Sequence, residues 1–323
     1  MSRGQSSAPD TAGVLGHWFA IELINWIWQF LPFCDLIAYG NTSGVNRVHV
    51  QDFLRRSTND EIRPFFDHPQ ALQNMLWQTH SLVSGSVALA ALLPPRLRTW
   101  DPQDMDIYTT KRSFSKVLTH VLAGGYTIIG ERTANPKYPG NTSIAQVVNL
   151  SNRKGRHLDI IVGNTKSALT LIFEYYGSHV VNCITGRGLY SAYPYHTLAN
   201  RVLINASIVT AHYFALTDEI HRCMIKYTIR GFTFQTNPLI YLATPHRCKE
   251  ASYCPHTVRD IFDRGGVAIA YNNTTAPVGF IRNNMQRIWR GRFLNVWAFG
   301  GDSCDVNATP AVTTDAFLLE IPR

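Results

Sequence analysis

The chain has 323 residues, of which 45% are hydrophobic and 16% are charged, and its formal net charge is +8 at pH 7. This balance excludes an intrinsically disordered chain, and the length allows one large domain or a medium domain with a smaller one. The six cysteines include no Cys-x-x-Cys pair, which excludes a disulfide framework and favours a reducing compartment. The basic residues are distributed along the whole chain without a dense Lys/Arg run, so the charge favours anionic ligands but does not distinguish nucleic acid from other anions.

The N-terminal part of the sequence predicts a polar tail followed by short helices. Residues 1–13 are small and polar and lack the apolar core of a signal peptide, so we expect an intracellular protein, cytoplasmic or nuclear. Apolar side chains recur at helical spacing over 18–31, but polar residues interrupt this run and it is too short to span a bilayer. Pro32 ends or kinks this helix, a short apolar segment follows at 34–39, and a further helical stretch is expected at 45–56.

Short strands that alternate with helices follow, which is typical of an α/β (α+β) domain with a mixed sheet. We expect strands at 81–83, 105–109, 126–130, 144–150 and 157–162, and helices at 87–93, 114–122, 166–176 and 217–230. The expected division of the chain is a tail (1–13), a helical module (14–60), a linking helix (61–80), the α/β core (81–235) and a C-terminal extension of strands and loops (236–323).

Three carboxylates in the expected core have a pattern typical of metal binding. Asp104 and Asp106 are two positions apart on an expected strand, so their side chains face the same way. Two carboxylates this close repel each other unless a cation lies between them, and magnesium or manganese prefers such hard oxygen ligands. Asp159, inside a later apolar strand, offers a third carboxylate. A site of this kind for two metal ions supports displacement at a phosphorus atom.

A turn of small residues provides a candidate phosphate site. Ser84-Gly85-Ser86 lies between an expected strand and a helix N-terminus, where free backbone N–H groups and the helix dipole attract phosphate. Gly85 allows the backbone to approach the ligand closely, and Ser86 adds a hydroxyl donor. Lys111 and Arg112 follow the strand that carries the two aspartates, and they either reach phosphates or form an exposed surface.

The order of a Gly-Ser turn, a helix, an Asp-x-Asp strand and a later buried aspartate resembles the nucleotidyltransferase-fold superfamily. The runs Ser84–Leu89, Trp100–Pro102 and Asp104–Tyr108 are more closely similar to a group of fungal nucleotidyltransferase-like proteins, many of which have an F-box-like N-terminus. The stretch His179–Ser191 shares this likeness, and the whole resemblance covers roughly residues 15–235.

The resemblance implies roles for the residues named above. Asp104 and Asp106 are expected to bind magnesium, and Asp159 to help bind it or to act as a base for the incoming hydroxyl. The turn Ser84–Ser86 is expected to hold the triphosphate of an NTP. One departure from the superfamily is the long segment between this turn and Asp104, which could tilt the turn away from the metal site.

The N-terminal helices resemble a degenerate F-box, a three-helix module that docks on a Skp1-type ubiquitin-ligase adaptor. The likeness implies an adaptor partner for residues 14–60, although Val14–His17 replaces the usual opening Leu-Pro. It is carried by Glu22-Leu23, Ile27, Phe30-Leu31-Pro32, Asp35-Leu36, Val48 and Arg55-Arg56.

The resemblances imply two alternative functions, and the basic charge permits a third. The first is a metal-dependent transferase that moves a nucleoside monophosphate from an NTP to a hydroxyl-type acceptor on a protein, an RNA or a small molecule. The second is a catalytically inactive nucleotidyltransferase-like recognition protein that acts as an F-box-type ubiquitin-ligase adaptor. The third is a tailing enzyme that modifies nucleic acid. No contact with a membrane is expected.

Overall fold

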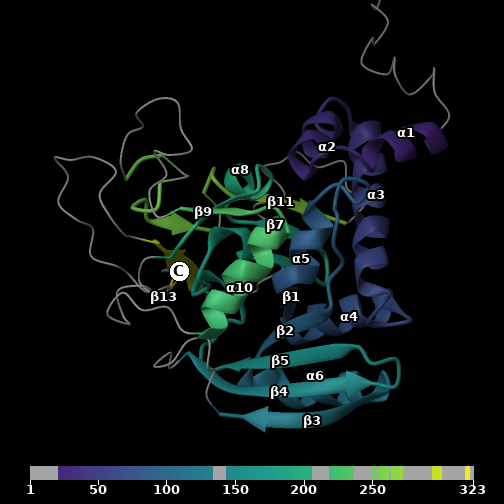
Figure 1. Ribbon diagram of the computed structural model, residues 1–323. Coiled ribbons are helices and arrows are strands. Elements are labelled where there is room, and N and C mark those ends of the chain that lie inside the picture. Colours follow the sequence, from purple (N-terminus) through teal and green to yellow (C-terminus); the bar gives the residue numbers. More distant parts are fainter. Residues whose placement is uncertain are drawn as a thin grey trace, which may run out of the picture.

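The structure is a computed structural model, and it describes residues 21–133, 143–205, 218–235, 249–251, 254–261, 263–271, 293–299 and 317–320. It has a mixed α/β fold, with strands of a mixed sheet through the centre and helices around them (Figure 1). The helices are α1 (Ile21–Trp28), α2 (Phe33–Gly40), α3 (Gly44–Ile62), α4 (Pro69–Thr79), α5 (Gly85–Leu92), α6 (Lys111–Ala123), α7 (Leu169–Phe173), the 3-10 helix η3 (Ser178–Val180), α8 (Pro194–Thr197) and α10 (Asp218–Ile229). The strands are β1 (Leu82–Ser84), β2 (Asp104–Thr110), β3 (Tyr126–Arg132), β4 (Ile144–Asn152), β5 (His157–Gly163), β6 (Asn182–Thr185), β7 (Gly188–Ser191), β8 (Arg201–Leu203), β9 (Thr233–Gln235), β10 (Arg259–Asp260), β11 (Val267–Ala270), β12 (Phe293–Trp297) and β13 (Phe317–Glu320).

Within the described part of the chain, eight strands form the main sheet in the order β11-β7-β6-β1-β2-β5-β4-β3. The central strand β2 pairs with β5 in parallel and with β1 antiparallel, so the sheet is mixed as the sequence predicts. The connection from β2 to its parallel neighbour passes through α6, β3 and β4, which satisfies the need for a long crossover between parallel strands.

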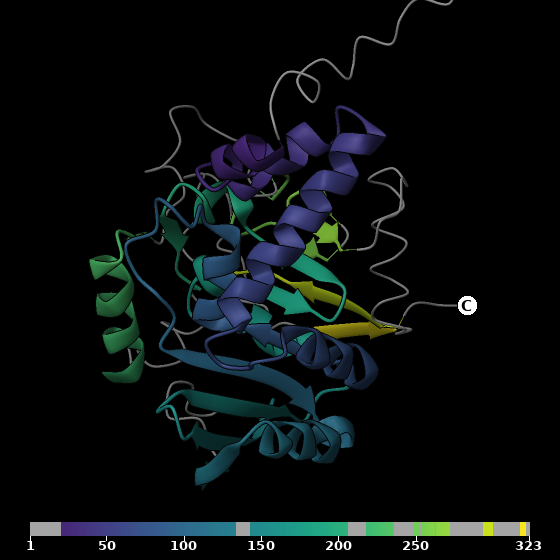
Figure 2. The same cartoon turned by 90° about the vertical axis from the view of Figure 1, so that its right-hand side faces the viewer.

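Side chains of β2 and β5 alternate between two hydrophobic layers. Met105, Ile107 and Ile160 belong to the cluster beneath α3, α4 and α6. Tyr108 and Ile161 belong to a second cluster on the opposite face, which also contains residues of α7 and α10. Figure 2 shows α10 well away from α3 and α4. The even-numbered positions of β2, which carry the two aspartates, therefore face the α10 side.

The N-terminal helices share their core with the sheet. Trp28, Phe53 and Leu54 are buried in the same cluster as the residues of α4, α6 and β2. The long helix α3 continues through Ile62, past the expected module boundary at residue 60, and contacts α5. The segment expected as a linking helix contains α4, which packs against α6 and β6 rather than only joining two domains.

The described elements confirm most of the expected strands and helices of the core. The helix expected over 166–176 was wrong in extent, because α7 covers only Leu169–Phe173. The chain leaves the helix there because its polar groups bond elsewhere: the Tyr175 carbonyl accepts a hydrogen bond from Asn205 Nδ2 at 3.1 Å, and Glu174 Oε1 accepts one from Ser143 Oγ at 2.8 Å.

The sheet also extends beyond the expected core boundary at residue 235. Strand β11 from the C-terminal part pairs with β7 and forms one edge of the main sheet, while β3 forms the other (Figure 1). The tail expected at 1–13 and much of the extension expected at 236–323 lie outside the described residues. Among the helices that are described, none combines the length and the apolar character that a membrane span requires.

Candidate active site

The expected phosphate turn connects β1 directly to α5, and its geometry requires glycine at its centre. Gly85 has a φ of +67°, which lies in the left-handed region that other residues rarely adopt. A Cβ atom added at this position would come closer than 3.0 Å to Oδ2 of Asp106. The carboxylate of Asp106 therefore lies directly against the backbone at the start of α5.

The two serines of the turn have different environments. The Ser84 hydroxyl is fully buried and donates to the carbonyls of Asn182 at 2.5 Å and Val180 at 3.3 Å, so it holds the turn to β6 and makes no side-chain cap on α5. The Ser86 hydroxyl instead donates to Asp104 Oδ1 at 3.3 Å. The first-turn N–H groups of α5 thus receive no cap from Ser84, and such groups attract an anion.

The structure places all three predicted carboxylates on one face of the sheet. Asp104 and Asp106 alternate with buried residues along β2, and the parallel register sets Asp159 of β5 directly beside Asp106. Neighbouring strands are about 4.8 Å apart, so these two side chains leave the sheet side by side. Asn149 Nδ2 of β4 donates to Asp159 Oδ1 at 2.6 Å, which holds this carboxylate from its other side.

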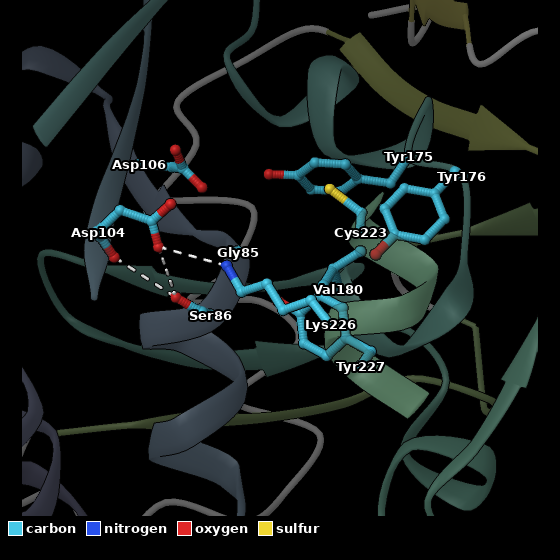
Figure 3. A pocket seen from close by; sticks show the side chains of 10 residues that line it. All are labelled: Gly85, Ser86, Asp104, Asp106, Tyr175, Tyr176, Val180, Cys223, Lys226 and Tyr227. Atoms are coloured by element: carbon cyan, nitrogen blue, oxygen red, sulfur yellow. Dashed lines mark hydrogen bonds and ion pairs between the residues drawn. The ribbon is translucent and has the colours of Figure 1, made fainter. Parts of the chain in front are cut away.

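A small pocket opens above Asp104 and Asp106 (Figure 3). One wall carries Tyr175, Tyr176 and Val180, and α10 provides Cys223, Lys226 and Tyr227. Gly85 and Ser86 complete the described lining. Asp159 does not belong to it. The enclosed cavity measures about 40 Å³, and the space including its open mouth about 400 Å³. The cavity alone has room for an ion or a water molecule, whereas a nucleotide has to extend through the mouth.

Lys226 is the basic side chain that the fold brings to the carboxylates. Its Nζ lies 3.7 Å from Asp104 Oδ1, and Figure 3 shows the side chain reaching from α10 across the pocket. Burial raises the pKa of the neighbouring Tyr227 phenol far above its ordinary value; nearby Arg230 opposes this rise, while Asp104 and Asp106 add to it. The negative charges of the two aspartates therefore act electrostatically on a side chain of α10, on the other side of the pocket.

Lys111 and Arg112 lie elsewhere. They are exposed at the start of α6, just after the last residue of β2, whereas Asp104 is the first residue of that strand. Seven residues of strand span roughly 20 Å, so both basic side chains begin far from the carboxylates, and neither belongs to the described lining of the pocket. Sequence reasoning missed Lys226, because an amphipathic helix far along the chain carries no local signal that it will face β2.

The arrangement of the carboxylates fits a divalent cation that a substrate helps to bind. Among the described residues, no group of three or more His, Cys, Asp or Glu side chains is arranged to hold a metal ion. Magnesium, however, is commonly held by one or two carboxylates together with water and substrate phosphates. Asp104 and Asp106 supply such a pair of hard oxygen ligands at one pocket. The role of Asp159 as a third ligand stays a prediction.

Comparison of the chain with models of known protein families, with curated proteins and with solved structures gives no match.

Proposed function

We propose that this protein is a metal-dependent nucleotidyltransferase that moves a nucleoside monophosphate from an NTP to a hydroxyl group and releases pyrophosphate. One observation carries the proposal: a single pocket unites the glycine turn at the start of α5 with Asp104 and Asp106 of β2. A phosphate site and a carboxylate pair are the two parts that catalysis of phosphoryl transfer requires, because its transition state is stabilised by charge and positioning.

Each part of the pocket has a role in this proposal. Asp104 and Asp106 would hold magnesium, which when bound supplies positive charge to the phosphate oxygens. The N-terminus of α5 and the Ser86 hydroxyl would bind the phosphate chain, and Lys226 would neutralise part of its charge. The acceptor oxygen forms a bond to the α-phosphorus while the bond to the bridging oxygen breaks, and pyrophosphate leaves with that electron pair. Asp159 would accept the hydroxyl proton.

The acceptor is a hydroxyl on a protein, an RNA or a small molecule, and it has to approach through the mouth of the pocket. The cavity beside the carboxylates is small, so in this proposal the base and the sugar of the nucleotide would lie towards the mouth. The net charge of +8 favours an anionic substrate, which agrees with a nucleoside triphosphate. The charge does not discriminate among the three classes of acceptor.

Metal-dependent binding of nucleotide tests this proposal. Each of the four NTPs is added with magnesium, and thermal unfolding is compared between the wild type and an Asp104→Asn/Asp106→Asn double variant. A ligand at 100 times its Kd stabilises the folded state by about 2.7 kcal/mol, which is readily measured. We expect a shift that needs metal and is lost in the double variant. The exposed Asp60→Asn on α3 is the matched control and should keep the shift. An equal shift in the double variant would contradict the proposal.

A second candidate function is supported by the surface of α1. Four large apolar side chains of this helix, Ile21, Leu23, Trp26 and Ile27, are between 41% and 52% exposed. Clustered exposed apolar residues mark interaction sites in soluble proteins. We propose these exposed side chains of α1 as the docking site for a Skp1-type adaptor, which is compatible with either an active or an inactive pocket.

Point substitution on α1 is the right test of the adaptor proposal. Deletion of residues 14–60 would also remove Val50, Phe53 and Leu54 from the shared core and would destabilise the whole fold. Trp26→Asp should abolish binding to a purified Skp1-type adaptor in calorimetry, while thermal unfolding checks that the variant is folded. Val258→Asp, at another exposed apolar position, should bind as the wild type does. Absence of binding by the wild type would refute the proposal.

A further inference from the structure

The pocket contains an internal positive charge beside one of its two carboxylates. Lys226 Nζ is 3.7 Å from Asp104 Oδ1, on the side of the carboxylate that faces the cavity. Ser86 Oγ donates to the same oxygen at 3.3 Å, which fixes the carboxylate from the α5 side. Figure 3 shows the lysine ammonium and the serine hydroxyl converging on Asp104. The ammonium thus lies in the region that a divalent cation bound to Asp104 would occupy.

The pocket also contains an internal negative charge at the phosphate turn. The Asp106 carboxylate lies so close to Gly85 that a side chain there would collide with Oδ2. The carboxylate of Asp106 therefore lies against the backbone at the start of α5, which Ser84 does not cap. A carboxylate at a helix N-terminus is stabilised by the same N–H groups and dipole that would bind a phosphate.

From these two observations we infer that the charges of the site compensate one another when no ligand is bound, with Lys226 in place of a metal and Asp106 in place of a ligand phosphate. This inference rests on the proposed function. A divalent cation that binds alone has to displace the lysine and draw Asp106 away from α5. When nucleotide binds together with the metal, its phosphates contact both the Lys226 ammonium and the N-terminus of α5. Metal and nucleotide therefore bind with positive coupling, and Lys226 is the positioning residue that creates it.

The displacement needs only a side-chain movement. Helix α10 is fixed by the buried residues Ile220 and Tyr227, and by Arg230, whose guanidinium lies 4.1 Å from the ring centroid of Trp100. Lys226 itself is only partly buried and has a flexible four-carbon stem, so its ammonium can move from Asp104 to a nearby phosphate while the helix stays in place.

Titration of the protein with Mn²⁺ alone, followed by the EPR signal of the free ion, tests this inference. Both side chains of the pair are more than a third exposed, so water weakens their interaction. A unit charge at this distance still changes the affinity of a competing cation by about three- to tenfold. Lys226→Met should therefore bind Mn²⁺ about three- to tenfold more tightly than the wild type, and Lys226→Gln should behave in the same way. Lys226→Arg keeps the charge and should bind Mn²⁺ as the wild type does.

The coupling is measured by repeating the titration with a non-hydrolysable NTP analogue. The analogue should increase the Mn²⁺ affinity of the wild type by a larger factor than that of Lys226→Met. Equal Mn²⁺ affinities in the wild type and in both uncharged variants would overturn the inference and leave the metal site of the proposed function intact. No Mn²⁺ binding by any of these proteins, even in the presence of the analogue, would overturn the metal site itself and the inference with it. Thermal unfolding checks that each variant is folded.

Discussion

Replacement of Arg98 by methionine would release the segment between α5 and β2 that leads to the carboxylates. The Arg98 guanidinium donates to Glu61 Oε1 of α3 at 2.8 Å, to the Ala90 carbonyl of α5 at 3.0 Å and to the Trp100 carbonyl at 2.7 Å. The side chains of Arg98 and Glu61 are only 8% and 10% exposed. This buried pair therefore fixes the path of the chain just before Asp104, and the turn at Gly85 and Ser86 lines the same pocket as Asp104 and Asp106.

The expected cost of the substitution follows from the burial of Glu61. Burial raises the pKa of this carboxyl above its ordinary value, and Arg98 counteracts the rise by hydrogen bonding and by its charge. Without the guanidinium, a buried carboxylate has no compensating charge, and loss of one partner of such a pair costs about 3–5 kcal/mol. The folded-state pKa of Glu61 then rises further above the unfolded value. The folded state takes up the extra proton in acid, so the destabilisation should be smaller at pH 5 than at pH 7.

Urea unfolding at the two pH values measures this effect. A Glu61→Gln/Arg98→Met double variant should recover about 2 kcal/mol of the loss, because the amide leaves no buried charge. Arg63→Met is the matched control: its partner Asp60 is exposed, and loss of an exposed pair costs less than about 1 kcal/mol. If Arg98→Met and Arg63→Met lose the same small amount of stability at both pH values, the role assigned to the buried pair is refuted.

Two further predictions concern the turn and a buried histidine. Gly85→Ala should lower the free energy of unfolding, measured in urea, by about 2–3 kcal/mol, because a Cβ at this position has an unfavourable positive φ and collides with Asp106. Gly155→Ala also has a positive φ but has open space around it, so it should lower the free energy of unfolding by only about 1 kcal/mol. Equal losses would contradict the close approach. Burial, with a contribution from Arg230, lowers the pKa of His179 to about 3, so the unfolded chain binds a proton that the folded protein rejects between about pH 6.5 and 3. As the pH is lowered through this window, this group reduces the free energy of unfolding by about 1.4 kcal/mol per pH unit, and His179→Leu should remove that share of the slope. An unchanged slope would contradict a neutral buried imidazole.

The sequence predicted the elements whose signals are local. Alternation of apolar and polar residues marked the strand that carries Asp104 and Asp106, and the Gly-Ser turn marked the start of α5. Asp159 lies beside Asp106 because β5 pairs with β2 in parallel as a neighbouring strand. These features depend on residues close in sequence or on neighbouring strands, where periodicity is informative.

The other half of the pocket depends on contacts between distant parts of the chain. Lys226 and Tyr227 face the carboxylates because Ile220 and Tyr227 pack into the second hydrophobic cluster, and an amphipathic pattern shows that a helix has a buried face without showing what covers it. Ser84 illustrates the reverse case. Its position in the motif suggested a phosphate contact, whereas the arrival of β6 beside β1 turns its hydroxyl towards Asn182.

The strand order also implies a sequence of events during synthesis. Strands β2 to β5 are consecutive in the chain and pair among themselves, so the carboxylate half of the sheet can form as soon as residue 163 has been made. The opposite edge needs β11, which reaches β7 only after the chain has extended to residue 270, and such non-local pairing is slow. Lys226 lies between these points. The strands that carry the carboxylates are therefore complete in a nascent chain before α10, and with it Lys226, has been made.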